Sequence, residues 1–242
     1  MMNVLVAGFG NMGKLVVSTI EKKADMQVVM IADDTNAPDL SKLEASVDVI
    51  IDFSHPNNLV WIAPFVKEHH CAYICGTTGH NEVQKKTIED LGKSAPIVFQ
   101  ANFSLGIAVF QEVLKMITPI LEDTYDIEVV EKHHNQKQDA PSGTAKMLVD
   151  TMNEKHSYKE IHGRNGFVGK RQKEIGIHAI RGGSVAGEHS VYFFGEDEIF
   201  EVKHTANSKQ IFVNGALLAA RFALQQDFGL YTMKDILFQH LD

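Results

Sequence analysis

One stretch in the second half of the chain, EKHHNQKQDAPSGTA at 131–145, gathers residue types that suit acid and anion chemistry. A histidine with a near-neutral pKa can donate a proton, and a lysine can hold a carboxylate or donate a proton itself. Pro141 closes the loop, and the next residues begin a helix whose hydroxyl and N–H groups suit an anion. The stretch predicts a general acid, a cation and an anion cradle, supplied by His133, His134, Lys137, Ser142, Gly143 and Thr144. The residues alone leave open a capped surface helix preceded by exposed basic side chains.

The two adjacent histidines do not predict a metal site. His133 and His134 end a predicted strand, and adjacent strand residues face opposite ways. No further Cys or His lies at the spacing of a zinc site. We therefore expect no metal.

A second candidate site lies near the N-terminus, where glycines have G-x-G-x-x-G spacing between a predicted strand and a predicted helix. The first glycine permits a tight turn, the second lets a pyrophosphate approach, and the third lets the helix pack closely. The segment predicts a dinucleotide loop formed by Gly8, Phe9, Gly10, Asn11, Met12 and Gly13. The alternative is a simple glycine-rich turn.

An acidic pair follows the second predicted strand. Asp33 lies 20 residues after Gly13, where a carboxylate can accept hydrogen bonds from the adenosine ribose. Asp34 follows it, with no Arg or Lys near, so a 2′-phosphate would meet two carboxylates. We expect NADH to be preferred, with NADPH possible. The alternative is that both aspartates decorate a surface loop.

Two further polar loops come at the carboxyl ends of predicted strands, where parallel α/β sheets bind ligands. Either loop by itself is equally compatible with a plain turn. The candidate cofactor contacts are Gly76, Thr77 and Thr78 in the first loop, and Gln100, Ala101, Asn102 and Phe103 in the second.

These segments must be positioned by a regular succession of elements. The first hundred residues alternate short β-branched runs with amphipathic helices, which predicts βαβ units and a parallel sheet. Strands are expected at 3–7, 27–32, 47–53, 72–75 and 96–99. Helices are expected at 12–24, at 82–93 and at 56–69, the last capped by Ser54.

The pattern then changes to α+β. We expect a helix at about 104–118, a strand at 125–134, a helix from 142 to about 155, strands at 174–182, 188–195 and 198–206, and a helix at 212–226. The GED turn at 195–197 predicts a hairpin. The fold class is α/β. A doubly wound parallel-sheet domain (1–104, completed by 212–242) is followed by an α+β domain on a mixed or antiparallel sheet (105–211).

Composition bounds the class of protein. The 242 residues carry a net charge of −8, which argues against a general nucleic-acid binder. No run approaches 18 apolar residues, so no membrane span is expected. Cys71 and Cys75, about 13 Å apart on a strand, predict no disulfide. We expect a cytoplasmic protein.

The chain resembles the bacterial dihydrodipicolinate reductases, now called 4-hydroxy-tetrahydrodipicolinate reductases. The stretch at 131–145 is similar to the family signature E-x-H-H-x-x-K-x-D-A-P-S-G-T-A. The glycine loop, GTTG, QANFS, RGGSVAGEHSVYF and HTANSKQIFVNGA follow in the family's order, so the resemblance covers essentially the whole chain.

The resemblance implies roles for individual residues. His133 matches the proton-donating histidine, Lys137 the catalytic lysine and His134 a substrate contact. Gly143 and Thr144 match the turn that holds a substrate carboxylate. It also implies a Rossmann-type first domain, with the glycine loop, Asp33, 76–78 and 100–103 at the cofactor, and a homotetramer built through the C-terminal sheets.

The sequence also departs from the family pattern. Many relatives carry a longer glycine loop with an arginine, and often an arginine after the ribose acid, where this chain has Asp34. Lys209 stands at a position that is often arginine. The glycine loop and Asp34 argue against NADPH as the preferred cofactor, although many members of the family accept both cofactors.

The implied reaction is the reduction of a small unsaturated cyclic dicarboxylate, on the route to diaminopimelate and lysine. Two other functions share the first domain: another nicotinamide oxidoreductase of amino-acid metabolism, and a non-enzymatic NADH-sensing regulator. The regulator would need a DNA- or partner-binding element, and the sequence shows no basic helix.

Overall fold

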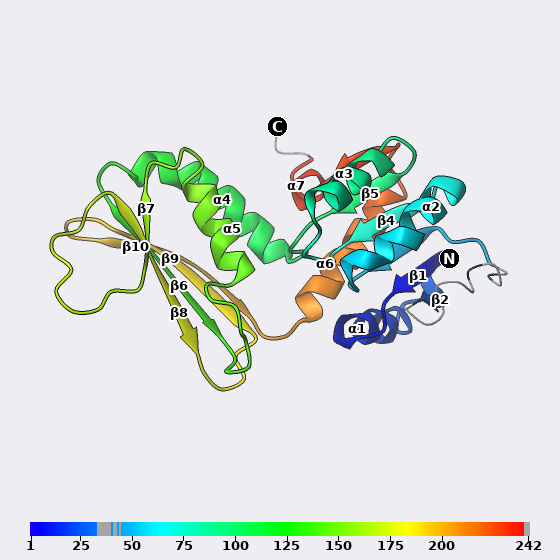
Figure 1. The fold of residues 1–242 in the computed structure, drawn as a ribbon, viewed down its shortest axis with the longest axis horizontal. Coiled ribbons are helices and arrows are strands. Elements are labelled where there is room, and N and C mark those ends of the chain that lie inside the picture. Colours follow the sequence, from blue (N-terminus) through cyan, green and yellow to red (C-terminus); the bar gives the residue numbers. More distant parts are fainter. Residues whose placement is uncertain (33–39, 41–42, 44, 240–242) are drawn as a thin grey trace. The chain divides into compact units, whose positions relative to one another are not determined.

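The chain folds into two compact units (Figure 1). The computed structural model describes residues 1–32, 40, 43 and 45–239. Unit 1 comprises Met1–Leu105 together with Gln210–Asp242, and unit 2 comprises Gly106–Lys209. Unit 1 is therefore built from two separate segments of the chain.

Unit 1 contains a six-stranded sheet with the order β11-β5-β4-β3-β1-β2. Every neighbouring pair is parallel. The strands are β1 (Met2–Ala7), β2 (Met26–Ala32), β3 (Val49–Asp52), β4 (Ala72–Cys75), β5 (Pro96–Phe99) and β11 (Gly229–Tyr231). Because β2 and β3 lie on opposite sides of β1, the carboxyl ends of β1 and β3 form the crevice at which such sheets bind ligands.

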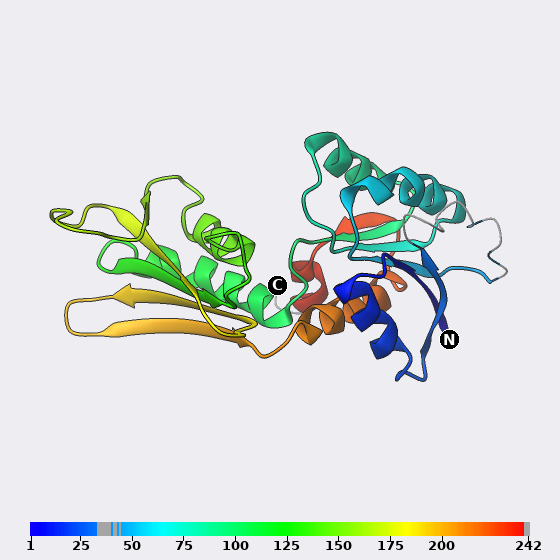
Figure 2. The same cartoon turned by 60° about the horizontal axis from the view of Figure 1, so that its bottom comes forward.

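Helices cover both faces of this sheet (Figure 2). α1 (Asn11–Ile20) and α6 (Gln210–Ala223) lie on one face, and α2 (Leu59–His69) and α3 (Glu82–Leu91) lie on the other. The strands are buried from both sides, which explains their nearly continuous apolar sequences. The short helix α7 (Met233–Leu237) follows β11. The predicted doubly wound domain is confirmed.

Unit 2 contains a five-stranded mixed sheet with the order β10-β9-β6-β8-β7. β6 pairs antiparallel with β9 and parallel with β8. The strands are β6 (Asp126–His133), β7 (Lys159–His162), β8 (Glu174–Arg181), β9 (Gly187–Phe194) and β10 (Ile199–Ala206). β9 and β10 form the expected antiparallel hairpin.

Two helices bury one face of the unit 2 sheet. α4 (Leu105–Leu121) and α5 (Gly143–Met152) pack apolar side chains on Ile127 and Val129 of β6. Alternate residues of β6 are buried along its whole length, so one face carries Ile127, Val129, Glu131 and His133. Glu131 and His133 are polar, so the apolar core ends at this part of the strand and a candidate functional site begins there.

The predicted cap of the helix after β3 is wrong. Ser54 donates its hydroxyl hydrogen bond to Asp52 instead. His55 is the N-cap of a short 3-10 helix η2 (Pro56–Asn58), and its Nδ1 accepts from the Asn57 N–H. The Ser54 Oγ in turn accepts from the Asn58 side-chain amide at 2.9 Å rather than from a backbone N–H of the helix start.

Other expectations differed at element ends. α1 ends at Ile20 rather than 24, and α5 ends at Met152 because Asn153 caps it. The strands β7 and β11 and the helix α7 were missed. All three are short, with three to five residues each, so their sequences carry little periodicity.

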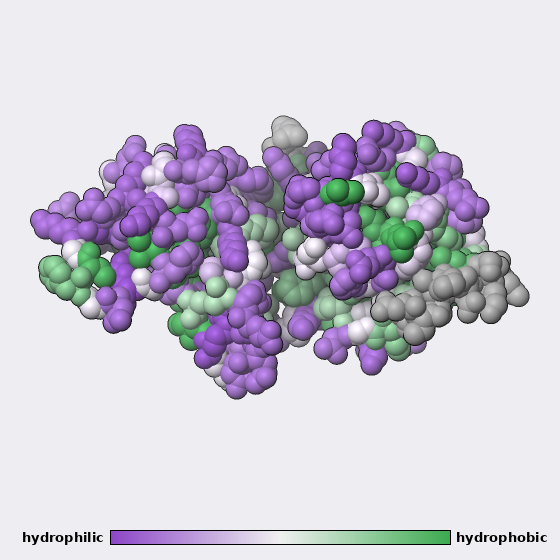
Figure 3. Space-filling view, viewed as in Figure 1, coloured by the Kyte–Doolittle hydropathy of each residue, from purple (hydrophilic) through white to green (hydrophobic). Residues whose placement is uncertain are grey.

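The face of the surface seen in Figure 3 is mostly hydrophilic, with small separate hydrophobic areas. No helix among the described residues is long and apolar enough to cross a membrane. Cys71 and Cys75 are both free and buried.

Candidate functional site

The glycine loop of unit 1 has the shape that a pyrophosphate requires. Gly8 follows β1 with φ of +84°, a left-handed conformation that favours glycine. A Cβ on Gly13 would overlap the Gly8 carbonyl oxygen, so the start of α1 packs directly on the turn. Gly10 is the N-cap of α1, and an added Cβ there would meet nothing within 4 Å. The residues fit a dinucleotide phosphate group at this helix N-terminus.

Side chains around the loop add a cation that sequence reasoning passed over. Phe9 and Asn11 are exposed, and Met12 is half-buried. Lys14, in the first turn of α1, places its Nζ 5.5 Å from the centroid of the Phe9 ring. A positive charge therefore stands at the loop. Asp33, the expected ribose contact, and Asp34 lie outside the described residues.

The two other candidate cofactor segments are brought together around Phe53. A Cβ on Gly76 would overlap the Phe53 ring, so glycine is required for this approach. The Phe53 ring meets the buried Phe103 edge to face at 5.8 Å, and the Gln100 N–H donates to the Cys75 carbonyl oxygen at 3.1 Å. Thr77 is buried, whereas Thr78 and Ala101 are exposed. The segments 76–78 and 100–103 thus form one edge of the sheet's carboxyl end.

The site of unit 2 is organised by a residue that was not singled out, Glu131. Its carboxylate is fully buried on β6, two residues from His133 and on the same strand face. One oxygen, Oε2, lies 2.5 Å from His133 Nδ1. The other, Oε1, accepts from the backbone N–H of Ser142 at 3.0 Å. One carboxylate therefore holds both the predicted acid and the predicted anion cradle.

Arg181 neutralises the negative charge of the buried Glu131 carboxylate. It stands opposite His133 in the parallel pairing of β6 with β8. Its two terminal nitrogens donate to the two oxygens of Glu131, each at 2.8 Å. The same guanidinium also donates to the Asp139 carbonyl oxygen. A two-point ion pair of this kind fixes orientation as well as charge.

Ser142 caps α5 and contacts a second buried histidine. Its Oγ accepts from the Ala145 N–H at 3.2 Å and lies 3.0 Å from His189 Nε2. The His189 ring meets the His133 ring edge to face at 5.2 Å. Gly143 follows with open space beside it, and Thr144 is half-buried. The start of α5 is therefore held in place by the hydrogen bonds of Ser142.

The lysine of the stretch is held by its own carboxylate partner. Lys137 Nζ lies 2.7 Å from Asp139 Oδ1, and its backbone N–H donates to the His134 carbonyl oxygen. His134 follows the last residue of β6 and is half-buried. The hydrogen bond from Lys137 lowers the pKa of Asp139. Lys137 is thus a positioned cation, with its side chain only 22% exposed.

One glycine leaves room beside the His133 ring. A Cβ on Gly187 would lie 3.1 Å from His133 Nε2. Since Nδ1 is engaged by Glu131, Nε2 is the ring nitrogen available to a ligand. Sequence reasoning missed Gly187, Glu131, Arg181, Asp139 and His189.

Burial and charge set the protonation of these groups. Burial alone would raise the pKa of Glu131, but hydrogen bonds from Arg181, His133 and the Ser142 N–H outweigh it and lower the pKa. Burial lowers the pKa of His133, and Glu131 opposes that shift only in part. Burial, helped by His133, lowers the pKa of His189 to about 4. Both imidazoles are therefore neutral at neutral pH, above an ionised carboxylate.

No cluster of three or more His, Cys, Asp or Glu side chains in the described parts of the chain is placed to hold a metal ion.

Comparisons with known proteins agree along the whole chain. The family model "Dihydrodipicolinate reductase, N-terminus" matches residues 2–103, and "Dihydrodipicolinate reductase, C-terminus" matches residues 106–237. The 4-hydroxy-tetrahydrodipicolinate reductase of Clostridium novyi is 39% identical over 98% of both chains. That of Brachyspira hyodysenteriae is 40% identical over 98% of this chain and 100% of its own.

Solved structures show the same fold. A dipicolinate-bound dihydrodipicolinate reductase from Paenisporosarcina sp. TG-14 aligns with a TM-score of 0.78 at 21% identity, covering 98% of this chain and 99% of its own. With both family models matched and close relatives similar from end to end, the chain belongs to the dihydrodipicolinate reductase family.

Proposed function

We propose that this chain reduces 4-hydroxy-tetrahydrodipicolinate, by way of dihydrodipicolinate, to tetrahydrodipicolinate, with NADH preferred and NADPH possible. The reaction belongs to the biosynthesis of diaminopimelate and lysine. Family membership supports the activity. The observation that carries the residue assignment is the buried Glu131 carboxylate, which holds His133 and the start of α5 at once.

His133 is the proton donor in this proposal. Glu131 accepts the hydrogen on Nδ1, which fixes the tautomer and directs Nε2 away from the carboxylate. The bound substrate carries two carboxylates, and their negative charge favours protonation of Nε2. His133 then delivers that proton to the ring as negative charge develops on the substrate, a role that contributes typically 10²–10⁴-fold.

Lys137 and the start of α5 hold the substrate's charge. Asp139 orients the Lys137 ammonium, which neutralises charge on the substrate or shares proton delivery. The helix start at Ser142, Gly143 and Thr144 binds one substrate carboxylate, with His134 as a further contact. The Ser142 N–H already donates to Glu131 and the Ser142 Oγ accepts from the Ala145 N–H, so these bonds hold the turn in place before the substrate arrives. A turn that is held in advance is the condition for effective electrostatic stabilisation.

When bound, the reduced nicotinamide supplies the hydride that enters C4 of the ring. The glycine loop 8–13 and the segments 76–78 and 100–103 are the residues that would hold the cofactor. The close Gly8–Gly13 packing and the open space at Gly10 support this assignment. The NADH preference rests on Asp33 and Asp34 in the sequence. Comparing kcat/KM for the two cofactors tests it, and a clear NADPH advantage would refute it.

The activity is tested by following NADH oxidation with enzymatically generated substrate. Consumption of NADH that depends on the substrate is expected. An NADH-sensing regulator would bind NADH without consuming it, and another oxidoreductase of amino-acid metabolism would be inactive with this substrate. Either result would overturn the proposal.

We also propose that the chain forms a cytoplasmic homotetramer through the unit 2 sheets. The support is the family resemblance and the face of that sheet opposite α4 and α5, which carries the exposed side chains of Ile180, Phe194 and Ile199. Sedimentation equilibrium is expected to give four times the chain mass of 26.9 kDa. A monomer at all concentrations would contradict this arrangement.

A further inference from the structure

A second buried carboxylate lies in unit 1, at the carboxyl end of β3. Asp52 is 1% exposed and is the last residue of the strand. Its Oδ1 accepts from the Thr77 hydroxyl at 2.7 Å, the Ser54 hydroxyl at 2.6 Å and the Ser54 N–H at 2.9 Å. Its Oδ2 accepts from the Tyr73 hydroxyl at 2.7 Å. All four donors are neutral groups.

The surrounding bonds settle the direction of these hydroxyls. Ser54 Oγ accepts from Asn58 Nδ2 at 2.9 Å, so its own hydrogen is available to Asp52. Thr77 Oγ1 accepts from the Ser54 N–H at 2.8 Å, so its hydrogen is also available to Asp52. The cluster therefore fits an acceptor-only, ionised carboxylate. Burying a carboxylate without such bonds has a large desolvation free energy. A buried carboxylate at the ligand-binding edge of the sheet is therefore a candidate for a functional role.

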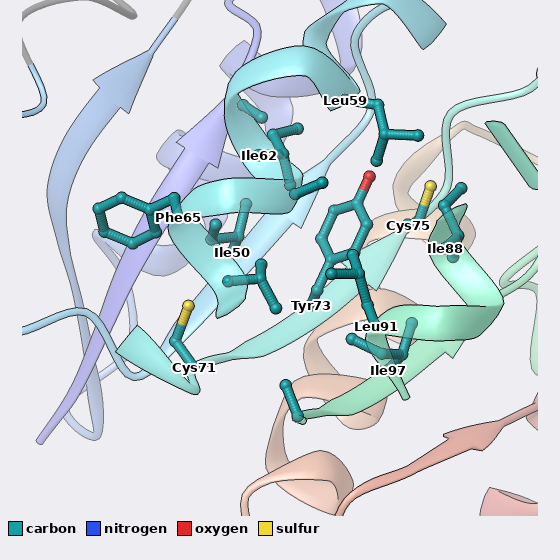
Figure 4. Packing of buried hydrophobic residues seen from close by; sticks show 14 of the residues in the cluster. Ile50, Leu59, Ile62, Phe65, Cys71, Tyr73, Cys75, Ile88, Leu91 and Ile97 are labelled. Carbon is teal, nitrogen blue, oxygen red and sulfur yellow. The ribbon is translucent and has the colours of Figure 1, made fainter. Parts of the chain in front are cut away.

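The two oxygens of Asp52 serve different parts of unit 1. Oδ2 binds Tyr73, whose ring lies in the core among Leu59, Ile62 and Ile88 (Figure 4). Oδ1 binds the loops that follow β3 and β4. The carboxylate thus joins a rigid core side chain to two loops at the ligand-binding edge.

Those loops are the ones that the cofactor needs. Thr77 lies in the segment 76–78, and the Gly76 N–H donates to the Asp52 carbonyl oxygen at 2.8 Å. Ser54 also packs closely on the glycine loop, since a Cβ added to Gly8 would overlap Ser54 Cβ at 2.6 Å, but no hydrogen bond among the described residues joins Ser54 to that loop. The hydrogen-bonded restraint therefore falls on 76–78 more than on the glycine loop.

We propose that Asp52 is a positioning residue for the nicotinamide half of the cofactor, acting through Thr77 and Ser54 on the loop 76–78. This inference rests on the proposed function, because that function assigns the nicotinamide to the loop. The adenosine and pyrophosphate half is assigned to the glycine loop, which has its own backbone packing. Loss of the Asp52 charge should therefore weaken one half of the binding site and spare the other.

The test compares the binding of NADH and ADP-ribose, which lacks the nicotinamide, to wild type and to Asp52→Asn. Asparagine keeps the shape but places an amide against hydroxyl donors. The Kd for NADH is expected to rise about 10-fold, while the Kd for ADP-ribose changes less than about 2-fold. An equal rise in the Kd of both ligands, or an unchanged Kd for both, would overturn the inference. A wild-type chain that binds neither ligand would instead overturn the proposed function.

Two further variants separate positioning from general stability. Tyr73→Phe removes the donor to Oδ2, so it should lower the Tm and leave the NADH Kd unchanged. An equal loss of NADH binding in Tyr73→Phe would mean that the cluster serves the core only, and the inference would fail. If Asp52→Asn does not fold, Ser54→Ala removes one donor to Oδ1 and keeps the charge. It should raise the NADH Kd about 3-fold with ADP-ribose unaffected, and an unchanged NADH Kd would overturn the inference.

Discussion

Glu131 and His133 lie two residues apart on one face of β6, with the carboxylate oxygen 2.5 Å from the imidazole Nδ1. This pair orients the ring, and the bond from Arg181 keeps the carboxylate ionised inside the core. The arrangement gives the histidine one nitrogen that is fixed by the protein and one that is available to chemistry. The predictions that concern unit 2 begin from this pair.

Glu131→Gln is expected to shift the pH profile of kcat/KM. The essential acid must be protonated, so kcat/KM falls as pH rises through the pKa of His133, which burial holds below 6.5. Removing the Glu131 charge lowers that pKa further, so the falling limb should move to lower pH by roughly one unit. Initial rates over a pH series, with NADH binding measured separately, check this.

Glu128→Gln is the matched control for that experiment. Glu128 also binds an arginine and a histidine, Arg164 and His178, but it lies on the opposite face of β6. Its loss should lower stability without moving the pH profile. A profile that shifts equally in both variants would contradict the role given to Glu131.

Lys137→Ala and His133→Ala are each expected to lower kcat by at least about 10-fold, with the NADH Kd nearly unchanged. Lys137 loses the positioned ammonium, and His133 loses the proton donor. Lys146→Ala, an exposed lysine on α5, should retain wild-type kcat. Wild-type turnover in either site variant would refute the role of that residue.

Gly10→Ala and Gly13→Ala are expected to fail in different ways. The Cβ on Gly13 would overlap the Gly8 carbonyl oxygen, so this variant should lose stability and show a lower Tm. The Cβ on Gly10 meets nothing within 4 Å, so Gly10→Ala should keep its Tm but weaken NADH binding by occupying space meant for the phosphates. Thermal melts and NADH titration distinguish the two, and full NADH affinity in Gly10→Ala would argue against this phosphate site.

His189 is expected to make stability depend on pH. Burial lowers its pKa from 6.5 to about 4, so the unfolded chain binds a proton between these values that the folded chain does not. The contribution of neutral His189 to the free energy of unfolding is therefore fully present above pH 6.5. It is lost as the pH drops toward 4, by up to about 3 kcal/mol. Burial also lowers the pKa values of His133 and His204, so these residues make stability fall with pH in the same direction. The contribution of His189 must therefore be measured by comparing a His189 variant with wild type.

Urea unfolding of His189→Gln across this window should show a shallower dependence on pH than wild type. His162→Gln, at a largely exposed side chain, should keep the wild-type dependence. An unchanged slope in His189→Gln would show that other groups dominate.

The sequence predicted the fold where the pattern was long and periodic. The strands at 72–75 and 96–99 coincide with β4 and β5, because buried parallel strands leave continuous apolar runs between loops. Ser54 was assigned to a cap because helix propensity is a local argument. The structure makes His55 the N-cap instead and directs the Ser54 hydroxyl to the buried Asp52 carboxylate, at the end of a strand that pairs with β4.

The candidate site was predicted in part. Glu131 was within reach of sequence reasoning, since it lies two residues before His133 in a strand and must share its face. Arg181 and His189 were not, because they meet Glu131 and Ser142 only through the pairing of β8 and β9 with β6. Gly187 has no reactive side chain, so its sequence position gives no signal. Its role is visible only in the structure, where the missing Cβ leaves space next to the His133 imidazole.

The assembly of unit 1 from two separate segments has a consequence for synthesis on the ribosome. β11 pairs with β5, and a Cβ on Gly215 of α6 would overlap the carbonyl oxygen of Phe103, so the C-terminal segment lies directly on the 100–103 loop. Nascent chains that stop after β10 would leave that loop and one sheet edge uncovered. The nucleotide-binding unit therefore starts first during translation and finishes last, after unit 2 has already emerged.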